Sequence, residues 1–545
     1  MKRILLLIYN ILLLGVAHAQ QPIEVAVICV NDFHGALVRD DFRGIPGAAA
    51  VVETIDSLRS VYPASVVVSA GDNFGGSYFY QTTRSESLLP LFFADCGIHI
   101  SGVGNHEFDE GQDKLLHCWR DIKRNLPAPD WHLQYVGANI RCDASSPMRK
   151  GNTSQPQFCN PHATEKLTLP DGRTFVVNFV GLTTSSTPRQ ASASKLKGLS
   201  FDGRIQQVLD SLPESMWEHA NANILLCHQG TTMKQVRRGC IIFNEPVWDD
   251  ADSLALSQLS DPRVNAILSS HSHKPVVGYI NDHRYAITQG ASQGRYLAML
   301  KLLVDSTSLE VQEVQPELIQ VTPKSYYSEK ATLLQTLVDQ QLKNTRTKGG
   351  AALGDYLTTA SKAIPFDRAL MKHDQTYMGQ LVTRAYSHAL RQTEGFDEKS
   401  LIVGVTHIGG MRTGLQAGPI RVMDVGEVLP FDNQMRAFRV TGKQLRALIE
   451  YGLHNERYGY LQFAHLTPKR SKTGHVKRLT YVTSTGKHIK IKESSTCYIV
   501  ADEFISNGGD GYEPALFPAK QEIHGLTLPR ITDAFINYLR LQKTI

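Results

Sequence analysis

The sequence predicts an α/β protein of two domains that is exported from the cytoplasm. Three observations support this prediction: the length of 545 residues, an alternation of short apolar runs with helical or loop segments, and a leader-like N-terminus. A chain of this length exceeds what one hydrophobic core usually serves, so two or three domains are expected. Hydrophobic residues make up 42% and charged residues 20% of the chain, a balance that excludes a disordered, fibrous or coiled-coil protein.

The N-terminus resembles a secretory signal peptide. Met1-Lys2-Arg3 precedes an apolar run from Ile4 to Val16, and small residues follow at 17 and 19. The run is shorter than the roughly 20 residues that a membrane span needs, which disfavours an anchor helix. We expect residues 1–19 to be removed, with no transmembrane segment in the remaining chain. The mature protein is then located in the periplasm, on the cell surface or outside the cell.

Net charge and cysteine content give two further expectations. Lys plus Arg number 57 and Asp plus Glu 52, a net charge of +5 without a dense basic run, so nucleic acid is not an expected partner. Export permits disulfides, and Cys142 and Cys159, in a polar loop, are the best candidates for one. Cys29 and Cys227 lie inside apolar runs and are predicted to be core thiols. The other cysteines are Cys96, Cys118, Cys240 and Cys497.

The first domain is predicted at 20–325 as an α/β sheet covered by helices. Its predicted strands are the apolar runs Val25–Val30, Ser65–Ala70, Ile98–Val103, Phe175–Val180, Ile224–Cys227 and Val264–Leu268.

An amphipathic helix at 328–344 and a Lys-Gly-Gly stretch at 348–350 mark the predicted boundary between the domains, residues 326–350. The second domain, 351–545, is predicted to be α+β. Its apolar runs are Leu401–Val405, Ala437–Val440 and Tyr498–Ala501.

Five polar clusters directly follow apolar runs of the first domain. Ligands collect beyond the carboxyl ends of strands in α/β sheets, so these clusters can converge on one site. Their Asp, Asn and His side chains offer oxygen and imidazole ligands for divalent ions. Singly, each cluster could be a turn or a solvated side chain, but five in order favour a metal site. They are Asp32-x-His34, Gly71-Asp72, Gly104-Asn105-His106-Glu107, His228, and His271-x-His273.

This series resembles that of the calcineurin-like metallophosphoesterases. More narrowly, the segments 31–35 and 104–109 resemble those of the secreted 5′-nucleotidase/UDP-sugar hydrolase family. The resemblance covers nearly all of the mature chain. It implies a four-layer β-sandwich flanked by helices and two divalent ions, with zinc or manganese ranked ahead of magnesium and cobalt. By the same resemblance, Asp32, His34 and His273 hold the first ion and Asp72 bridges both. Asn105, His228 and His271 hold the second. Ser270 stands where the family usually has Gly.

His106 and Asp109 form a candidate catalytic pair. An Asp three residues after a His can orient the imidazole and favour its cation, which then stabilises the leaving oxygen or transition-state charge. The alternative for Asp109 is a cap at the start of a helix. Resemblance to the family's His–Asp dyad favours the catalytic role.

Three glycine-rich or turn segments of the second domain are candidate substrate loops. Arg412 offers a planar fork for phosphate, and the amides of Gly409 and Gly410 offer further donors. Phe431 and Phe504 could stack on a base, although core packing is the simpler interpretation of either ring alone. Asp510 could accept hydrogen bonds from ribose hydroxyls.

These segments resemble the GG-x-R, PF-x-N and GGDGY motifs of the family's C-terminal nucleotide-binding domain. The resemblance implies Arg412 on phosphate, Phe431 and Phe504 on the base, Asn433 on the base edge and Asp510 on the ribose. It also implies that residues 326–350 act as a hinge, about which the second domain rotates to carry the substrate to the metals. Two positions of the second domain differ from the family: Lys372, four residues after Arg368, replaces the second Arg of a pair, and His407 replaces a small polar residue, usually Asn.

We therefore expect an exported dimetal phosphohydrolase that removes phosphate from nucleoside 5′-phosphates, AMP first and ADP or ATP next. The same scaffold also suits a 2′,3′-cyclic-nucleotide phosphodiesterase/3′-nucleotidase or a UDP-sugar pyrophosphatase. A catalytically silent nucleotide-binding protein of the cell surface is the alternative from another class, and seven convergent ligands disfavour it. The sequence is compatible with a monomer or a dimer.

Overall fold

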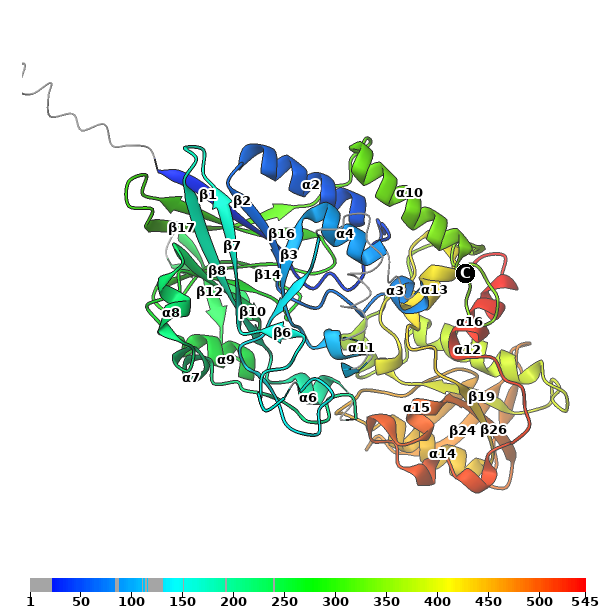
Figure 1. Cartoon of the computed structure of the whole chain (residues 1–545). Coiled ribbons are helices and arrows are strands. Elements are labelled where there is room, and N and C mark those ends of the chain that lie inside the picture. Colours follow the sequence, from blue (N-terminus) through cyan, green and yellow to red (C-terminus); the bar gives the residue numbers. More distant parts are fainter. Residues whose placement is uncertain are drawn as a thin grey trace, which may run out of the picture. The chain divides into compact units, whose positions relative to one another are not determined.

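The computed structural model describes residues 22–83, 88–109, 111–112, 115, 131–149, 151–191, 194–238 and 241–545. The expected signal peptide lies outside these residues. The chain forms two compact units, each with its own core (Figure 1). The first contains Met1–Gly75 and Ser85–Leu337, and the second contains Gly76–Arg84 and Val338–Ile545. The mixed α/β fold expected from the sequence is confirmed.

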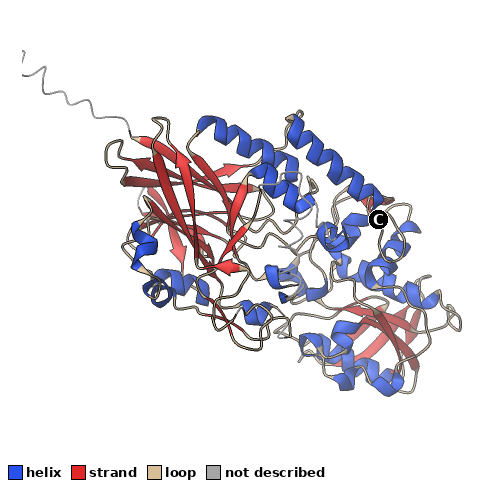
Figure 2. Cartoon of the chain, viewed as in Figure 1, coloured by secondary structure: helices blue, strands red, loops and turns tan. Residues whose placement is uncertain are grey.

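The first unit is a sandwich of two mixed β-sheets with helices outside them (Figure 2). One sheet has the order β17 (Val311–Gln320), β16 (Tyr296–Val304), β1 (Ile23–Val30), β2 (Ser65–Ser69), β3 (Ile98–Gly102), β4 (Gln134–Val136) and β6 (Cys159–Asn160). The other has the order β14 (Pro275–Ile280), β15 (Tyr285–Gly290), β13 (Ala266–Ser269), β10 (Ala222–His228), β8 (Thr174–Thr183) and β7 (His162–Thr168). All six apolar runs predicted in this half are strands, and β1–β2–β3 and β8–β10–β13 pair in parallel.

Alternate residues of these strands fill the space between the two sheets, as the two-residue period of a strand requires. Val27 and Val68 from one sheet and Phe179 and Leu226 from the other belong to one buried core. A second core packs the outer face of the six-stranded sheet against helices. The helices of this unit are α2 (Ala48–Val61), α4 (Leu88–Cys96), η1 (His106–Phe108), α6 (Thr187–Gln190), α7 (Ile205–Asp210), α8 (Glu214–Glu218) and α9 (Ala251–Ser257). Two small ribbons complete it: β5 (Ile140–Cys142) with β9 (Leu199–Phe201), and β11 (Thr232–Arg238) with β12 (Ile241–Val247).

The disulfide predicted between Cys142 and Cys159 is wrong. Both cysteines are buried free thiols, and they lie on strands of different sheets, β5 and β6. Cys29 and Cys227 are buried free thiols in β1 and β10, as expected. Cys118 and Cys240 lie outside the described residues.

The chain passes between the units within α10 (Glu329–Asn344), the helix predicted at 328–344. Its buried stripe is Ala331, Leu334, Val338 and Leu342, at helical spacing. Leu333 lies outside this stripe and is 57% exposed.

The second unit has a four-stranded sheet, β21 (Met435–Thr441), β26 (Thr496–Asp502), β19 (Ile402–Thr406) and β22 (Gln462–Phe463). A three-stranded sheet, β23 (Leu466–Arg470), β24 (Val476–Val482) and β25 (His488–Lys490), and the pair β18 (Tyr356–Ala360) with β20 (Gly418–Arg421) accompany it. Its α-helices are α3 (Tyr78–Thr83), α11 (Arg368–Met371), α12 (Tyr377–Arg391), α13 (Val422–Val428), α14 (Gly442–Gly452), α15 (Glu503–Ser506) and α16 (Ile531–Arg540). Its 3-10 helices are η2 (Ile408–Gly410), η3 (Gly509–Gly511), η4 (Pro514–Leu516) and η5 (Ala519–Gln521).

Helix α3 belongs to the second unit because it packs on α13, more than 300 positions later in the chain. The amide of Tyr78 donates to Glu427 at 3.0 Å. A Cβ at Gly426 would lie 1.9 Å from the Tyr78 ring, so only glycine permits this contact.

Candidate active site

Five strands of the first unit end in the polar clusters that the sequence singled out. β1, β2 and β3 deliver Asp32, His34, Asp72 and Asn105, and β10 and β13 deliver His228 and the pair His271 and His273. Because the strands within each of these two sets run parallel, their carboxyl ends lie at one edge of their sheet.

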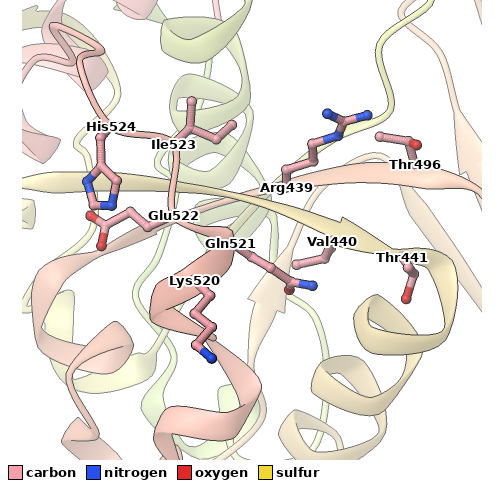
Figure 3. A pocket seen from close by; sticks show the side chains of 9 residues that line it. All are labelled: Arg439, Val440, Thr441, Thr496, Lys520, Gln521, Glu522, Ile523 and His524. Carbon is pink, nitrogen blue, oxygen red and sulfur yellow. The ribbon is translucent and has the colours of Figure 1, made fainter.

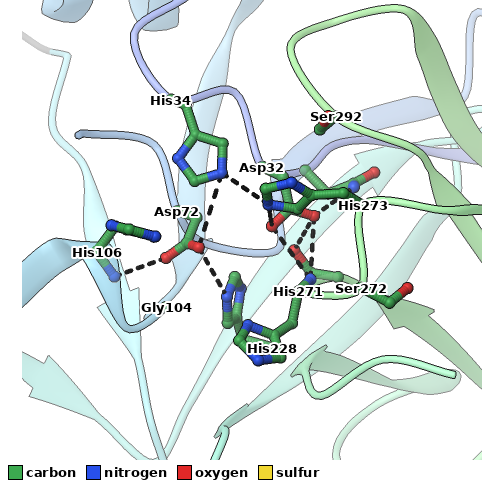
Figure 4. Close-up of polar contacts among 12 residues, drawn as sticks. Asp32, His34, Asp72, Gly104, His106, His228, His271, Ser272, His273 and Ser292 are labelled. Carbon is green, nitrogen blue, oxygen red and sulfur yellow. Dashed lines mark hydrogen bonds and ion pairs between the residues drawn. The ribbon is translucent and has the colours of Figure 1, made fainter. Parts of the chain in front are cut away.

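The structure brings six of the seven predicted ligands into two groups that share Asp72 (Figure 4). One contains Asp32, His34, Asp72 and His273, and the other contains Asp72, His228 and His271. The ligand atoms of each group lie within 4.8 Å of one another. Asp72 Oδ2 is 3.1 Å from His228 Nε2 and 3.9 Å from His34 Nε2, so one carboxylate faces both groups.

The donor atoms of these groups fit a pair of cations. Asp72 Oδ2 and His228 Nε2 are buried and have no hydrogen-bond partner in the described structure, and the same is true of Oδ1 of Asn105, the seventh predicted ligand. Leaving buried polar atoms unpaired is costly unless another group satisfies them. His34 Nε2 and His273 Nε2 face each other at 2.9 Å, as two imidazoles do when they point at a common centre. Oxygen and imidazole donors of this kind suit zinc, manganese and similar ions.

Most of these ligands are held in an unfavourable backbone conformation. Asp32, His34, Asp72, His271 and His273 all have positive φ, between 47° and 76°. Residues other than glycine seldom adopt this left-handed region, and it costs free energy that the surrounding structure must offset. Strain of this kind is concentrated at functional sites in proteins. Sequence reasoning did not predict it.

Glu107 fixes the loop that carries Asp72, a role that the sequence did not reveal. Its buried carboxylate accepts hydrogen bonds from the amides of Asp72 at 2.9 Å, Asn73 at 2.8 Å and Gly104 at 2.7 Å. One side chain therefore joins the loops after β2 and β3. The one feature of the sequence that pointed to Glu107 was its position within the 104–109 cluster.

Ser270, the position that differs from the family pattern, contacts the first group of ligands. Its hydroxyl donates to Asp32 Oδ2 at 2.7 Å, and the amide of His271 donates to the same carboxylate. Asn31 Nδ2 donates to Asp32 Oδ2 at 2.8 Å. Hydrogen bonds of this kind orient metal ligands and tune their affinity.

The histidines of the two groups differ in protonation. His34 and His271 favour the neutral imidazole. Although burial opposes protonation of His228, the charge of Asp72 raises its pKa to about 10. His228 Nδ1 lies 2.9 Å from the carbonyl oxygen of Ala70, which leaves Nε2 to face Asp72. Burial lowers the pKa of His34 and that of His271 to about 4, so both imidazoles are neutral at physiological pH, the form that binds a metal ion. Although burial opposes ionisation of Asp72, His228 and its neighbouring imidazoles hold the pKa of that carboxyl well below its ordinary value.

His106 and Asp109 form the pair that the sequence suggested. His106 Nδ1 lies 2.7 Å from Asp109 Oδ2, and Asp109 lies at the end of η1 rather than at the start of a helix. Burial opposes protonation of His106, but the hydrogen bond to Asp109 and the charge of Asp72 raise its pKa to about 9. The amide of His106 donates to Asp72 Oδ1 at 2.8 Å.

In the second unit, His407 lies between two other candidate substrate residues. Its Nδ1 is 2.6 Å from Asp510 Oδ2, and its ring stacks on Phe504 with centroids 5.0 Å apart. His407 is only 6% exposed, whereas Phe504 is 44% exposed. A Cβ at Gly410 would lie 2.9 Å from His407 Nε2, so this glycine gives the imidazole its space.

Of the other predicted substrate residues, Phe431 and Arg368 lie near Arg412. The Arg412 guanidinium lies over the Phe431 ring at 5.0 Å. Burial, with the nearby Arg368 charge, lowers its pKa, and the Asp510 charge acts in the opposite direction. Phe431 is 47% exposed, so neither it nor Phe504 is a core residue. Lys372, at the end of α11, is exposed, and Asn433 is half-buried with its carbonyl bonded to the amide of Ile531.

Two further features of the second unit are separate from these residues. A cavity of about 620 Å³ is lined by residues of β21, β26 and 520–524, among them Arg439, Lys520 and His524 (Figure 3). No candidate substrate residue lines it. Glu450, His454 and His475 form a third group of possible metal ligands, but both imidazole Nδ1 atoms lie within 2.7 Å of Glu450 oxygens.

Two ligand groups that share a buried carboxylate at the strand ends of a β-sandwich define a metal-dependent hydrolase with two adjacent ions. Comparison with known families agrees with this class. The calcineurin-like phosphoesterase model matches residues 25–275, and the model of the 5′-nucleotidase C-terminal domain matches 356–516. The chain belongs to the calcineurin-like metallophosphoesterases that carry a 5′-nucleotidase C-terminal domain, and it is a hydrolase of that type.

Known relatives are distant but extend over most of the chain. Endonuclease YhcR of Bacillus subtilis is 22% identical over 96% of this chain, which spans only 40% of that protein's length. A probable 5′-nucleotidase of Treponema pallidum is 22% identical, with 95% of this chain and 92% of the relative covered. The crystal structure of a 5′-nucleotidase precursor from Thermus thermophilus has the same fold, with a TM-score of 0.64, 21% identity and coverage of 96% and 97%. Among the described helices, none is both long and apolar enough to cross a membrane.

Proposed function

We propose that this protein is an exported dimetal phosphohydrolase that removes the phosphate from nucleoside 5′-phosphates such as AMP. One observation supports the proposal above all: Asp72 is shared by two groups of possible metal ligands, and its Oδ2 atom, like His228 Nε2 and Asn105 Oδ1, is buried without a hydrogen-bond partner in the described structure. Two adjacent ions, zinc or manganese ahead of magnesium and cobalt, would supply a water of lowered pKa and neutralise the phosphate charge. Asp32, His34 and His273 would hold one ion, and Asn105, His228 and His271 the other.

His106 supports the chemistry without holding an ion. Since Asp109 and Asp72 favour its protonated form, His106 can place a positive charge beside the phosphate and stabilise the leaving oxygen. Its backbone amide also fixes the orientation of Asp72.

The second unit would recognise the nucleoside. Phe431 and Phe504 expose aromatic surface for a base, and Asp510 offers a carboxylate for ribose hydroxyls. Arg412, with Arg368 nearby and Lys372 at the end of the same short helix as Arg368, would attract the phosphate. We propose that α10 and residues 345–350 act as the hinge between the two units, where a few residues absorb the backbone change.

A substrate panel tests this proposal. Purified mature protein should release phosphate from AMP, and to a lesser extent from ADP and ATP, and a chelator should abolish the activity until divalent metal is restored. UDP-glucose, 2′,3′-cyclic nucleotides and a phosphoester without a base complete the panel. Higher kcat/KM on UDP-glucose or a cyclic nucleotide would replace the 5′-nucleotidase proposal with one of those activities. No metal-dependent turnover of any of them would reject a hydrolytic role.

A further inference from the structure

The three-stranded sheet β23–β25 accounts for the net positive charge of this protein. Residues 469–492 contain eight of the 57 Lys and Arg residues and none of the 52 Asp and Glu residues. The rest of the chain then has 49 basic and 52 acidic residues, so its formal charge is slightly negative. The charge is spread over three strands and their turns, which explains why no dense basic run is visible in the sequence.

This sheet and its turns bury apolar side chains and expose basic ones. Val476, Leu479, Tyr481 and Ile491 belong to the hydrophobic core of the second unit, which also contains residues of α14. All eight basic side chains are exposed. We call these residues the basic face: Lys469, Arg470, Lys472, Lys477, Arg478, Lys487, Lys490 and Lys492.

The basic face places like charges against one another. Lys469 on β23 is paired directly with Arg478 on β24. Thr480, two residues after Arg478 and therefore on the same face, is paired with Lys490 on β25. Like charges directly opposite one another destabilise a sheet, and no residue of the basic face forms an ion pair within the described chain.

A groove of about 360 Å³ lies at one end of the basic face, between the start of α14 and residues 490–493. Lys477, Arg478, Lys490 and Lys492 line it, together with Arg446 and Glu493. Glu493, the one acidic residue in the lining, is paired with Arg446 at 2.7 Å. Four cations of the groove are therefore left without a counter-charge from the described chain.

The lining indicates which anionic partner fits. No aromatic side chain lines the groove, whereas sites for single-stranded nucleic acid combine cations with aromatic rings that stack on bases. Clusters of four to eight Lys and Arg residues bind anionic lipid head groups when they lie beside a membrane helix or on an amphipathic helix, and the basic face has the same number and kind of charges. An open face with a shallow groove at its end suits a planar array of phosphates.

We propose that the basic face binds the phosphate head groups of an anionic lipid surface. This binding is independent of the proposed nucleotidase activity, because none of its residues belongs to the ligand groups or to the candidate substrate residues.

Sedimentation of the mature protein with vesicles tests this inference. Vesicles of phosphatidylcholine alone are compared with an equimolar mixture of phosphatidylcholine and phosphatidylglycerol. The wild type should bind only the mixed vesicles, with an affinity that falls as salt is added, since salt screens exposed charges. The triple variant Lys469→Glu, Arg478→Glu, Lys490→Glu should bind them at least about 100-fold more weakly. A control with the same charge change at exposed lysines elsewhere, Lys362→Glu, Lys399→Glu, Lys543→Glu, should bind as the wild type does.

Two outcomes would overturn the inference. If the control loses as much affinity as the triple variant, net charge rather than the basic face governs binding. If free tripolyphosphate or an oligonucleotide binds through Lys469, Arg478 and Lys490 while vesicles do not sediment the protein, the partner is not a lipid surface. A circular dichroism spectrum and melting temperature of the triple variant close to wild type would show that the fold survives the substitutions.

Discussion

At the scale of single residues, a substitution of His106 should slow the chemical step without changing metal binding. His106 neighbours Asn105, but its Nδ1 is bonded to Asp109 and it belongs to neither ligand group. His106→Ala should therefore lower kcat for AMP by about 10²–10⁴-fold, the scale for losing a positioned acid or charge-stabilising group. Metal content, measured by elemental analysis, should stay at the wild-type level. Loss of an ion from this variant would make His106 a ligand and reject the role proposed for it.

Ser270 should tune metal affinity through Asp32. Removing its hydroxyl in Ser270→Ala deletes the 2.7 Å hydrogen bond to the carboxylate. We expect the dissociation constant of the ion held by Asp32, His34 and His273 to rise by about 10–100-fold, with activity restored by excess metal. Ser272→Ala is the matched control, because that hydroxyl donates to the carbonyl of Thr231 and not to a ligand. Equal metal titrations for the wild type and Ser270→Ala would show that this bond does not influence the site.

Phe504 should distinguish substrates with a base from those without one. Stacking on one aromatic ring is worth about 1–3 kcal/mol, so Phe504→Ala should raise KM for AMP by roughly 10- to 100-fold. The same change should leave hydrolysis of a base-free phosphoester almost unaltered. His407→Asn, which removes the ring stacked on Phe504, should shift the same ratio in the same direction by a smaller factor. Equal losses on both substrates, with a lower melting temperature, would make Phe504 a structural residue.

At the scale of elements, Glu107 joins two ligand loops and should be needed for both. In Glu107→Gln, one carboxylate oxygen that accepts backbone N–H groups becomes an NH₂ group that cannot accept them. Leaving a buried donor unpaired costs about 1–3 kcal/mol, so the free energy of unfolding should fall by about 1–3 kcal/mol for each N–H group that loses its acceptor. Metal content should fall as well, because Asp72 and Asn105 lie on these loops. Denaturant unfolding with and without metal measures both effects, and an unchanged variant would contradict the role assigned to Glu107.

The elements also show what the sequence could and could not predict. Six of the strands of the first unit were predictable because each is an apolar run bounded by polar or glycine-rich residues, and five of these six carry the ligands at their ends. The hydrogen bond between Ser270 and Asp32 was not predictable from the sequence. These residues are 238 positions apart, and the packing of β1 near β13 brings them together. Cys142 and Cys159 are close in sequence, but the strands that hold them belong to different sheets, so proximity along the chain was misleading. The left-handed backbone of five ligands has no sequence signal, because glycine, its usual marker, is absent at these positions.

At the scale of the whole molecule, the two units should respond to different ligands. The metal-ligand groups lie in the first unit, and the candidate nucleoside residues lie in the second. A ligand that binds only the folded state stabilises the unit that holds it, by about 2.7 kcal/mol when its concentration is 100 times its dissociation constant. Metal and nucleotide should therefore act on separate unfolding transitions.

Differential scanning calorimetry of the mature protein tests this expectation. Chelation should lower the transition of the first unit and leave that of the second unchanged. AMP added to the chelated, inactive protein should raise the transition of the second unit alone, and Phe504→Ala should abolish that shift while Asp72→Asn should preserve it. In Asp72→Asn the first transition should no longer respond to added metal, because the carboxylate shared by both ligand groups is lost. A shift of both transitions by AMP, or a response of Asp72→Asn to metal equal to that of the wild type, would contradict the division of roles between the units.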